Sequence, residues 1–312
     1  MGLLVNGEWH DRWYNTKKSG GKFVRQDSAF RHWVSNDGST PFPAEADRYH
    51  LYVAMACPWA HRALIFRALK GLQAAIPVSV VGPDMLSEGW VFDDTHPDHQ
   101  FGFRHLHQIY TRAAPDYTGR VTVPVLWDKK QNTMVNNESS EIIRMFNSAF
   151  AGVGAPLTDT DYYPEHLREQ IDEINHIVYH NVNNGVYKAG FATTQAAYDE
   201  AVGALFDTLD QLEARLQETE WLVGDQITEA DWRLFTTLFR FDLVYHTHFK
   251  CCRRRLRDYP ALWAYTRTLY NHPGIAETTD IAETRRHYFY SHESINPHRI
   301  VPVNPDISFA LD

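Results

Sequence analysis

The residue best suited to chemistry is Cys57, in a run that reads Val-Ala-Met-Ala-Cys-Pro-Trp-Ala-His-Arg over residues 53–62. The run follows an alternating segment, residues 49–53, that predicts a half-buried strand. It opens a segment that predicts a helix over residues 58–70, and proline suits the first helical position because its missing N–H costs nothing there. Unpaired N–H groups and the positive end of the helix dipole favour an anion at this terminus. We therefore predict that Cys57 reacts as a thiolate.

The neighbours of Cys57 limit that chemistry. Where a redox pair would need its second cysteine, three residues later, the chain has Ala60. A dithiol-disulfide cycle within the motif is therefore excluded, and a mixed disulfide with a small external thiol remains. The alternative is a buried structural cysteine, since free cysteine is among the most buried residue types. The order of strand, loop, cysteine and helix is that of a thioredoxin-like domain.

Length and composition fit a globular protein with more than one core. The chain has 312 residues, of which 44% are hydrophobic and 13% aromatic, and this is enough for two domains. It has no run of about 20 apolar residues, and its first residues are too polar for a secretory signal. The three cysteines do not make a disulfide framework, which fits a reducing compartment. We expect a cytoplasmic protein without a membrane partner.

Charge and motifs exclude several further classes. The net charge of −9 argues against a nucleic-acid partner, and the arginine-rich residues 253–257 are typical of a solvated face or of carboxylate partners. The chain has no Gly-x-Gly-x-x-Gly or Walker loop, so no nucleotide cofactor is predicted. The histidine pairs lack the cysteine partners or the His-Glu-x-x-His spacing of a zinc site, and we predict that none binds a metal. These pairs are His96 and His99, His105 and His107, and His246 and His248.

The chain divides into three segments by pattern. Residues 1–45 are rich in Gly, Ser, Asn and Trp and predict an N-terminal extension. Residues 46–155 carry the α/β pattern, and residues 160–312 predict an all-helical domain. The helices of that domain are expected at 165–181, 195–216, 228–245, 260–270 and 279–289. Thr228 to Asp231 has the form of a capping box, which indicates a folding element.

Two features of the α/β segment bear on a thiol site. Residues 76–81 predict a second strand, residues 82–119 a long insertion, and residues 120–127 a strand interrupted by Pro124 and paired with 133–135. A cis proline at this place would leave the backbone of the preceding residue open to an extended thiol peptide. Glu138 and Ser139 open a helix that continues through residue 146, and the simplest interpretation of the pair is a helix cap.

Together these features resemble the cytosolic glutathione transferases: a thioredoxin-like α/β domain followed by an all-α domain. The run Cys57-Pro58-Trp59-Ala60-His61-Arg62, together with Trp90 and Asn137-Glu138-Ser139, is similar to the xi class, the glutathionyl-hydroquinone reductases. A late segment resembles that class too, through Tyr288, Ile295-Asn296-Pro297 and Ile300-Val301-Pro302. The resemblance covers residues from about 30 to about 305.

The resemblance implies glutathione-dependent reduction of glutathionyl-hydroquinones to hydroquinones, with glutathione as co-substrate and no bound cofactor. Cys57 would take glutathione from the aromatic carbon as a mixed disulfide, and a second glutathione would release glutathione disulfide. Val123 would pair with the glutathione backbone, and Glu138 and Ser139 would hold its γ-glutamyl end. Trp90 and Arg120 would complete that pocket. The resemblance also implies a homodimer.

The resemblance further implies that Tyr187, Tyr245 and Tyr288 of the helical domain form the aromatic substrate wall and supply a proton. A phenol can donate a proton to the departing carbon and a hydrogen bond to a thiolate. We predict Tyr187 as the acid, with Tyr245 and Tyr288 steadying the thiolate. Two other functions stay open: an omega-like thioltransferase or dehydroascorbate reductase, and a non-catalytic transferase-like interaction module.

Overall fold

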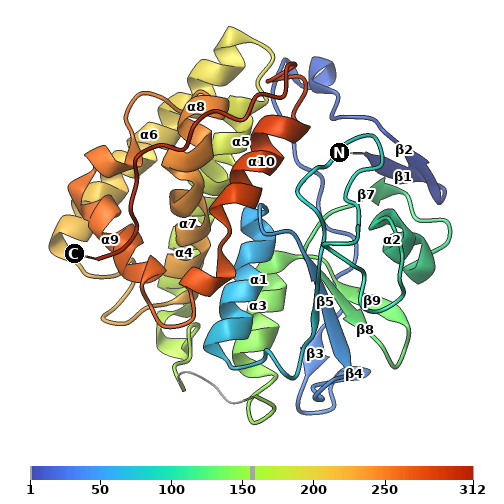
Figure 1. Ribbon diagram of the computed structural model, residues 1–312. Helices are drawn as coiled ribbons and strands as arrows, with labels where there is room; N and C mark the ends of the chain where they lie inside the picture. The colour runs from blue at the N-terminus through green and yellow to red at the C-terminus, as the bar shows by residue number, and fades with distance from the viewer. Residues whose placement is uncertain (1, 155–158, 312) are drawn as a thin grey trace. The chain divides into compact units, whose positions relative to one another are not determined.

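The computed structural model describes residues 2–154 and 159–311, and the chain divides into two compact units (Figure 1). The first unit comprises Met1–Trp13, Gln26–Thr160 and Glu277–His287, and the second comprises Tyr14–Arg25, Asp161–Ala276 and Tyr288–Asp312. The domain boundary expected at residue 155 falls outside the described residues, and the expected domain limits stay predictions.

A mixed sheet forms the centre of the first unit, in the order β6-β5-β8-β9. The strands are β5 (Tyr49–Val53), β6 (Val78–Val80), β8 (Val125–Asp128) and β9 (Thr133–Asn136). β5 runs parallel to β6 and antiparallel to β8, with Leu51 opposite both Val78 and Leu126. All five residues of β5 are buried, so the prediction of a half-buried strand is wrong. β5 lies between two neighbouring strands in a sheet that helices cover, which explains its burial on both faces.

Helices cover this sheet on both faces. α1 (Pro58–Leu69) and α3 (Ser139–Ser148) lie side by side on one face, and α2 (His107–Ala113) lies on the other, next to β9 (Figure 1). α1 connects the parallel strands β5 and β6, as a crossover between parallel strands requires. The predicted helix and strand around Cys57 are confirmed. The expected insertion over residues 82–119 contains α2, which its irregular pattern did not indicate.

The N-terminal extension adds small sheets. β1 (Leu3–Val5) pairs with β2 (Glu8–His10) and also with β7 (Gly119–Arg120). The β1–β2 turn is Asn6-Gly7, and both residues have positive φ, the conformation that two-residue hairpins favour. β3 (Val34–Ser35) and β4 (Phe42–Pro43) form a separate parallel pair. Residues 120–127 are therefore not one strand, because the segment leaves the β1 sheet at Arg120 and joins the central sheet at Val125.

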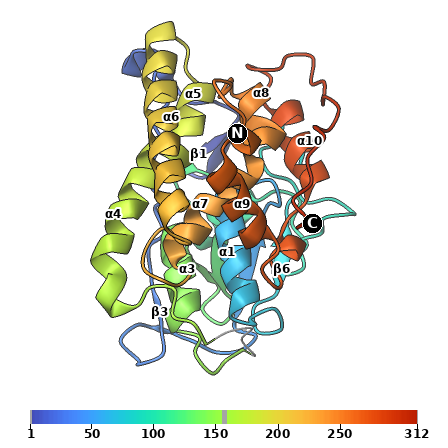
Figure 2. The same ribbon diagram turned by 90° about the vertical axis from the view of Figure 1, so that its left-hand side faces the viewer.

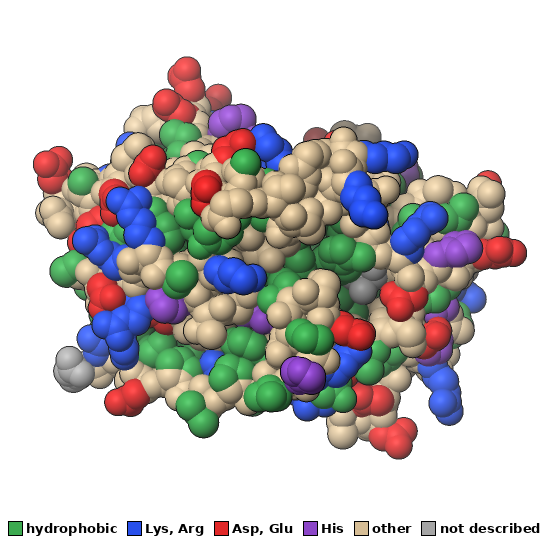
Figure 3. Space-filling view, turned by 90° about the horizontal axis from the view of Figure 1, so that it is seen from above, with side chains coloured by type: hydrophobic (Ala, Val, Ile, Leu, Met, Phe, Trp, Pro, Cys, Tyr) green, Lys and Arg blue, Asp and Glu red, His purple; other side chains and the backbone are tan. Residues whose placement is uncertain are grey.

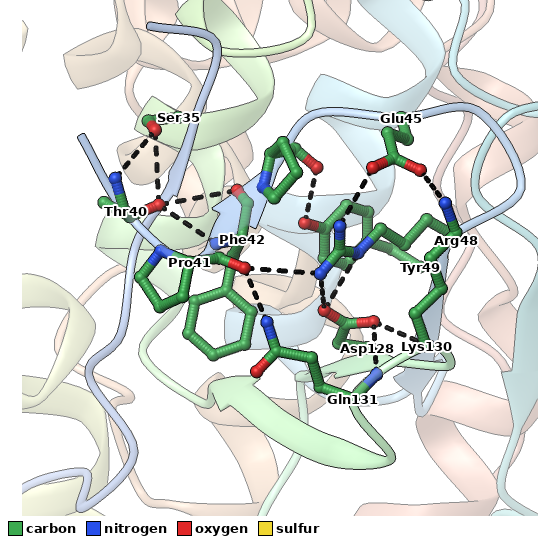
Figure 4. Close-up of polar contacts among 11 residues, drawn as sticks. Ser35, Thr40, Pro41, Phe42, Glu45, Arg48, Tyr49, Asp128, Lys130 and Gln131 are labelled. Atoms are coloured by element: carbon green, nitrogen blue, oxygen red, sulfur yellow. Dashed lines mark hydrogen bonds and ion pairs between the residues drawn. The ribbon is translucent and has the colours of Figure 1, made fainter. Parts of the chain in front are cut away.

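A buried ion pair ties the segment before β5 to the end of β8 (Figure 4). The guanidinium of Arg48 donates to a carboxylate oxygen of Asp128 through two nitrogens, at 2.9 and 2.6 Å. The carbonyl of Pro41 accepts from Arg48 and from Gln131, and the hydroxyl of Tyr49 donates to the carbonyl of Pro43. Either charge would be costly to bury alone, and the pair lets the two compensate each other. It also links the segment before β5 to the end of β8.

The second unit is built almost wholly of helices, among which the long α6 stands upright in Figure 2. α6 packs against α5 and α9, and α7 packs against α4 and α9. The α-helices are α4 (Arg168–Val178), α5 (Gly185–Gly190), α6 (Gln195–Glu218), α7 (Glu229–Arg240), α8 (His246–His248) and α9 (Pro260–Tyr270). Short 3-10 helices cover Thr16–Ser19, Glu165–Leu167 and Leu256–Asp258, and π-helices cover Tyr179–Asn183 and Phe241–Tyr245.

The last helix belongs to both units along the chain. α10 (Ile281–Ser291) begins in the first unit and ends in the second, after a 3-10 turn at Ala276–Thr278. The helices predicted in the second domain are all present. Their ends differ by a few residues, except that α9 matches its prediction at both ends.

The predicted capping box before α7 is confirmed. One carboxylate oxygen of Asp231 accepts from the backbone N–H of Thr228 at 2.7 Å and from its hydroxyl at 3.0 Å. The other oxygen accepts from the N–H of Leu222 and from the hydroxyl of Tyr265. Asp231 is fully buried, so its four donors replace the water it has lost. The motif is a folding element, as the sequence indicates.

The arginine-rich residues 253–257 lie close to carboxylates of the second unit. Arg253 contacts Asp207 and Asp210 at 3.6 and 3.8 Å, and Arg255 pairs with Asp258 at 2.8 Å. On the face drawn in Figure 3, acidic and basic side chains are interspersed. Within residues 2–154 and 159–311, no helix has both the length and the apolar character that a membrane crossing requires.

Candidate active site

Cys57 is the N-cap of α1, on the loop that follows β5. Its backbone is extended, with φ −79° and ψ 119°, and Pro58 takes the first helical position as predicted. The side chain is half-buried, and its thiol forms no disulfide. Sγ donates to the carbonyl oxygen of Val123 at 3.6 Å. The structure thus places the thiol at a helix N-terminus and beside the backbone that precedes Pro124, which is the geometry the thiolate hypothesis needs.

The Val123–Pro124 peptide bond is cis, which confirms the prediction for this proline. Val123 lies in the connection between β7 and β8, outside both strands. The preceding residue, Thr122, is fixed by Tyr110, whose hydroxyl donates to its carbonyl at 2.8 Å and accepts from its N–H at 3.1 Å. Tyr110 therefore holds the connection in which Val123 faces the thiol.

Glu138 and Ser139 lie at the start of α3, as predicted. Glu138 is the N-cap, and one carboxylate oxygen accepts from the N–H and the hydroxyl of Ser140 at 3.0 and 2.9 Å. The other oxygen accepts from the hydroxyl of Ser28 at 3.1 Å. Burial acts to raise the pKa of Glu138, but the hydrogen bonds from Ser140 and Ser28 and the charge of Arg62 outweigh it and hold the pKa below its usual value. The carboxylate is thus ionised at neutral pH, whether it serves as a cap or as a partner for an ammonium group.

Arg62 lies beside the predicted glutathione residues, and the sequence analysis assigns it no role there. It lies on α1 and is almost fully buried, with its guanidinium 4.6 Å from the centre of the Trp59 ring. One of its nitrogens donates to the hydroxyl of Ser139 at 3.4 Å, so Arg62 links the cysteine helix to the start of α3. The available signal was a charged residue directly before the apolar run 63–66, because arginine is rarely fully buried unless it is paired.

Trp90 and Arg120, the two other residues predicted to bind glutathione, belong to the same unit. Trp90 is buried and stacks on the ring of His287, with ring centres 4.7 Å apart. Arg120 is half-buried at the end of β7, and it donates to the carbonyl of Arg12 at 2.5 Å. The predicted contacts of both side chains with glutathione stay predictions.

The three predicted tyrosines meet in the second unit, although they are far apart in the sequence. The hydroxyl of Tyr288 is 2.5 Å from that of Tyr187 and 3.0 Å from that of Tyr245. Tyr245 and Tyr288 are fully buried, and burial, followed by the coulombic effect of Tyr187, raises the pKa of each well above 10. Tyr187, on α5, is the half-buried member. Tyr245 and Tyr288 therefore keep their protons at neutral pH, and Tyr187 is the partly accessible member of the cluster.

The N-terminal extension supplies neighbours to both predicted groups, which the sequence analysis also missed. In the first unit, beside the Ser28–Glu138 contact, the N–H of Asn137 donates to the carbonyl of Phe30, and the N–H of Phe30 donates to the side-chain oxygen of Asn137. In the second unit, the guanidinium of Arg25 lies 4.9 Å from the centre of the Tyr187 ring, and its Nε donates to Asn184. A cation at that distance from the ring face is attracted to it. No local sequence signal marks such contacts, because the residues are more than a hundred positions apart.

The other two cysteines differ from Cys57. Cys251 is fully buried, and burial raises the pKa of its thiol. Cys252 is exposed. Neither is the N-cap of a described helix, so Cys57 is the thiol that the helix dipole can activate.

Comparison with known proteins agrees with this geometry. Models of the glutathione S-transferase N-terminal domain and C-terminal domain match residues 56–149 and 195–268. Glutathionyl-hydroquinone reductase YqjG of Escherichia coli is 56% identical, over 98% of this chain and 95% of its own. Glutathionyl-hydroquinone reductase PcpF of Sphingobium chlorophenolicum is 54% identical, over 98% of this chain and 96% of its own.

Solved structures show the same architecture. The glutathione-bound structure of Escherichia coli YqjG superposes with a TM-score of 0.91 at 51% identity, over 99% of this chain and 97% of that one. The xi-class transferase of Natrialba magadii gives a TM-score of 0.93 at 46% identity, over 100% of this chain and 95% of that one. A thioredoxin-like unit with a lone cysteine and a helical unit define a glutathione transferase. The chain belongs to that family, in the xi class of glutathionyl-hydroquinone reductases.

Proposed function

We propose that the protein reduces glutathionyl-hydroquinones to hydroquinones with glutathione as the reductant. The observation that carries this proposal is the half-buried Cys57 at the N-terminus of α1, with alanine where a second thiol would stand. Two relatives that match nearly the whole chain are named for this activity. The omega-like thioltransferase has less support for the same reason.

The reaction proceeds in two exchanges at sulfur. The Cys57 thiolate attacks the sulfur of the glutathionyl group, a Cys57–glutathione S–S bond forms, and the carbon–sulfur bond breaks. The electron pair of that bond passes to the ring carbon, which takes up a proton, and the hydroquinone leaves. The thiolate of a second glutathione then attacks the glutathione sulfur of the mixed disulfide, and glutathione disulfide leaves as Cys57 recovers its thiolate. Overall, one carbon–sulfur bond is reduced, and the glutathionyl sulfur of the substrate and one glutathione thiol end in one disulfide.

Glutathione would bind along the first unit. Its cysteinyl backbone would pair with Val123, whose carbonyl lies next to the thiol. The ammonium group of its γ-glutamyl end would pair with Glu138, and the carboxylate of that end with Ser139 and the nearby guanidinium of Arg62. Trp90 and Arg120 complete this proposed pocket. A half-buried carboxylate next to a buried guanidinium suits a ligand end that carries both charges.

The tyrosine cluster would supply the proton for the departing carbon. Tyr187 is the proposed acid, because it is the partly accessible member and is hydrogen-bonded to Tyr288. Tyr245 and Tyr288 would support its hydroxyl and donate a hydrogen bond to the thiolate. After Tyr187 gives its proton to the carbon, a hydrogen bond from Tyr288 would stabilise the remaining phenolate.

The decisive experiment is steady-state release of hydroquinone from a glutathionyl-hydroquinone with excess glutathione, for the wild type, Cys57→Ala and Cys252→Ala. We expect turnover in the wild type and in Cys252→Ala, and none in Cys57→Ala. Mass spectrometry of the wild type after one turnover without added glutathione should show one glutathione on Cys57. A wild type that reduces mixed disulfides but releases no hydroquinone would establish the omega-like thioltransferase instead.

We also propose a cytoplasmic homodimer without a nucleic-acid or membrane partner. The three thiols and the carboxylate-paired arginines support the compartment and the absence of polyanion binding. Light scattering should give twice the chain mass of 36.1 kDa, and a mass of one chain would reject the dimer.

A further inference from the structure

Three side chains with metal-binding atoms meet in the first unit, outside the residues assigned to glutathione. Glu88, His105 and His107 each offer one ligand atom, and these atoms all lie within 4.8 Å of one another. An ion about 2.0–2.2 Å from nitrogen and oxygen ligands holds them roughly 3.3 Å apart in tetrahedral geometry. The side chains therefore need only small rotations to reach a common ion.

Glu88 is held at the tip of a tight turn. The N–H of Gly89 donates to the carbonyl of Leu86 at 3.0 Å, and Gly89 has a φ of +69°. The indole of Trp9 donates to the carbonyl of Ser87 at 2.8 Å, and a Cβ at Gly89 would lie 2.6 Å from the Trp9 ring. Glycine is required here both by its φ and by the indole, so Trp9 and Gly89 fix the backbone that carries Glu88.

The two histidines are held by the start of α2. His107 is the first residue of α2 and stacks on Trp9, with ring centres 4.9 Å apart. The N–H of His105 donates to the side chain of Gln108 at 3.0 Å. The rings of His105 and His107 are almost parallel, with centres 5.0 Å apart. Trp9 thus supports both His107 and the turn that carries Glu88.

Each histidine has a ring nitrogen that is buried and makes no hydrogen bond to any described residue: Nδ1 of His105 and Nε2 of His107. A buried polar atom without a partner is costly, and an ion or ordered group at this place would remove that cost. The χ2 angle of histidine is soft, which allows the stacked rings to turn toward one ion.

We propose that Glu88, His105 and His107 form a binding site for a divalent transition-metal ion such as Zn²⁺ or Ni²⁺. Two imidazoles and one carboxylate are a ligand set that such ions accept, with water completing the coordination. This opposes the sequence-based prediction for His105 and His107. The zinc-site spacings apply to ligands close together in the sequence, whereas the third ligand here comes from the turn before Trp90. An ion at this site would tie that turn to α2.

A second histidine pair provides the matched comparison. His176 and His180 are exposed, one helical turn apart, with ring centres 4.4 Å apart. Residues four apart lie on the same helix face, so this pair could bind the same ions. Among the described residues, no third His, Cys, Asp or Glu lies close enough to form a three-ligand group with this pair. The variant His176→Gln therefore tests whether bound metal belongs to the exposed pair.

The experiment is a calorimetric titration of the full-length, metal-stripped protein with Ni²⁺, in a buffer that does not bind metal. The wild type and His176→Gln should share a binding event that His105→Gln and Glu88→Gln lack. Loss of a ligand should weaken binding by more than the about 10–100-fold that loss of an outer partner costs. Ni²⁺ quenches indole emission at short range, so the quenching that accompanies this event should fall in Trp9→Phe.

Binding that is unchanged in both His105→Gln and Glu88→Gln, or that disappears only in His176→Gln, would overturn the proposal. Thiols present in every variant contribute equally and cancel. If His105→Gln fails to fold, Glu88→Gln carries the test, because Glu88 is exposed at the tip of a turn. The readout is metal binding, so its outcome is independent of the reductase activity.

Discussion

At the scale of single residues, Glu138 has two roles to fill. It caps α3 through Ser140, and it presents an ionised carboxylate next to Arg62. A cap can be made by many residues, but a carboxylate held ionised in a half-buried position suits the ammonium group of a ligand. Substitution can separate these roles.

We predict that Glu138→Gln raises the KM for glutathione by about 10–100-fold, because a hydrogen bond to a charged group is worth about 1.5–3 kcal/mol. Turnover at saturating glutathione should fall much less, since Glu138 does not contact the reacting sulfur. Glu141→Gln, on the same helix turn and paired with the more exposed Arg31, is the control and should leave KM unchanged. Equal KM values for wild type and Glu138→Gln in steady-state kinetics would reject the role.

The pH dependence follows from the same carboxylate. Its pKa in the folded protein lies below its usual value of about 4.3. The stability it contributes is therefore present above about pH 4.3 and is lost as the pH falls through the folded-state pKa. Between pH 5 and 8 the charge of Glu138 is constant. Any change in KM over that range must then come from other groups, and KM profiles of wild type and Glu138→Gln should run parallel.

The three tyrosines differ in solvent exposure, and Tyr187 is the most exposed. We predict that Tyr187→Phe lowers kcat by about 10²-fold or more, the range that a positioned general acid contributes, with little change in the KM for glutathione. Tyr198→Phe is the control, because its hydroxyl is bonded to the carbonyl of Lys250 and not to the cluster. A larger loss in Tyr245→Phe than in Tyr187→Phe would assign the acid role to Tyr245 instead.

At the scale of elements, the sequence predicts those with long or regular patterns. The strand before Cys57, α1, the hairpin of β8 and β9, and α9 all follow from periodicity and end signals. It does not predict α5, the six-residue helix that carries Tyr187, because so short a segment has no measurable period. Gly190 ends that helix against Phe249, where a Cβ would lie 2.2 Å from the ring, and such a tertiary contact has no local signal.

The candidate site divides in the same way. Cys57 and Glu138 stand at helix starts and could be found from local pattern. The meeting of Tyr187, Tyr245 and Tyr288 depends on tertiary packing, and only the family resemblance predicts a role for these tyrosines. Tyr245 lies at the end of a π-helical segment, Phe241–Tyr245, that continues α7. A change of helix type shifts which side chains share a face, and a period of 3.6 residues does not reveal it.

The cap of α7 is the element whose loss should affect stability most directly. We predict that Asp231→Asn lowers the free energy of unfolding by about 1–3 kcal/mol, because an amide group would face donors that now reach a carboxylate oxygen. Asp225→Asn, in the exposed loop before the helix, is the control and should have no effect. Urea unfolding of both variants measures the difference, and equal midpoints would reject the role.

Burial raises the pKa of Asp231, which fixes the sign of its pH effect. A carboxyl whose folded-state pKa is raised contributes most stability below its unfolded pKa of about 3.9, and this contribution falls as the pH rises through the folded-state value. The stability gap between wild type and Asp231→Asn should therefore narrow as the pH is raised from 4 toward neutrality.

At the scale of the whole molecule, the N-terminal extension is shared between the units. Residues up to Trp13 belong to the first unit, Tyr14–Arg25 to the second, and Gln26 onward to the first again. Within the second unit, Phe23 and Arg25 contact the ring of Tyr187. Within the first, Ser28 contacts Glu138. The extension is thus part of the environment of both predicted groups.

We predict that deletion of residues 1–25 lowers kcat by about 10–100-fold, because a small displacement of a catalytic group has costs of that order. Both this deletion and the shorter one below remove Arg12 and β1, which hold Arg120, so any rise in the KM for glutathione should be the same in the two variants. Deletion of residues 1–13 alone is the control, because it leaves Phe23 and Arg25 in place, and its kcat should fall less. Equal kcat values for the two deletions would show that these contacts do not position Tyr187.

Ala60 has a consequence for the chemical state of Cys57 between turnovers. In the proposed reaction, no thiol at that position could displace glutathione from Cys57, so the lifetime of the adduct would depend on the concentration of external glutathione. Where glutathione is scarce, molecules would accumulate with their thiol already capped, protected from the irreversible steps of oxidation. The proportion of capped molecules would then increase as the concentration of free glutathione falls.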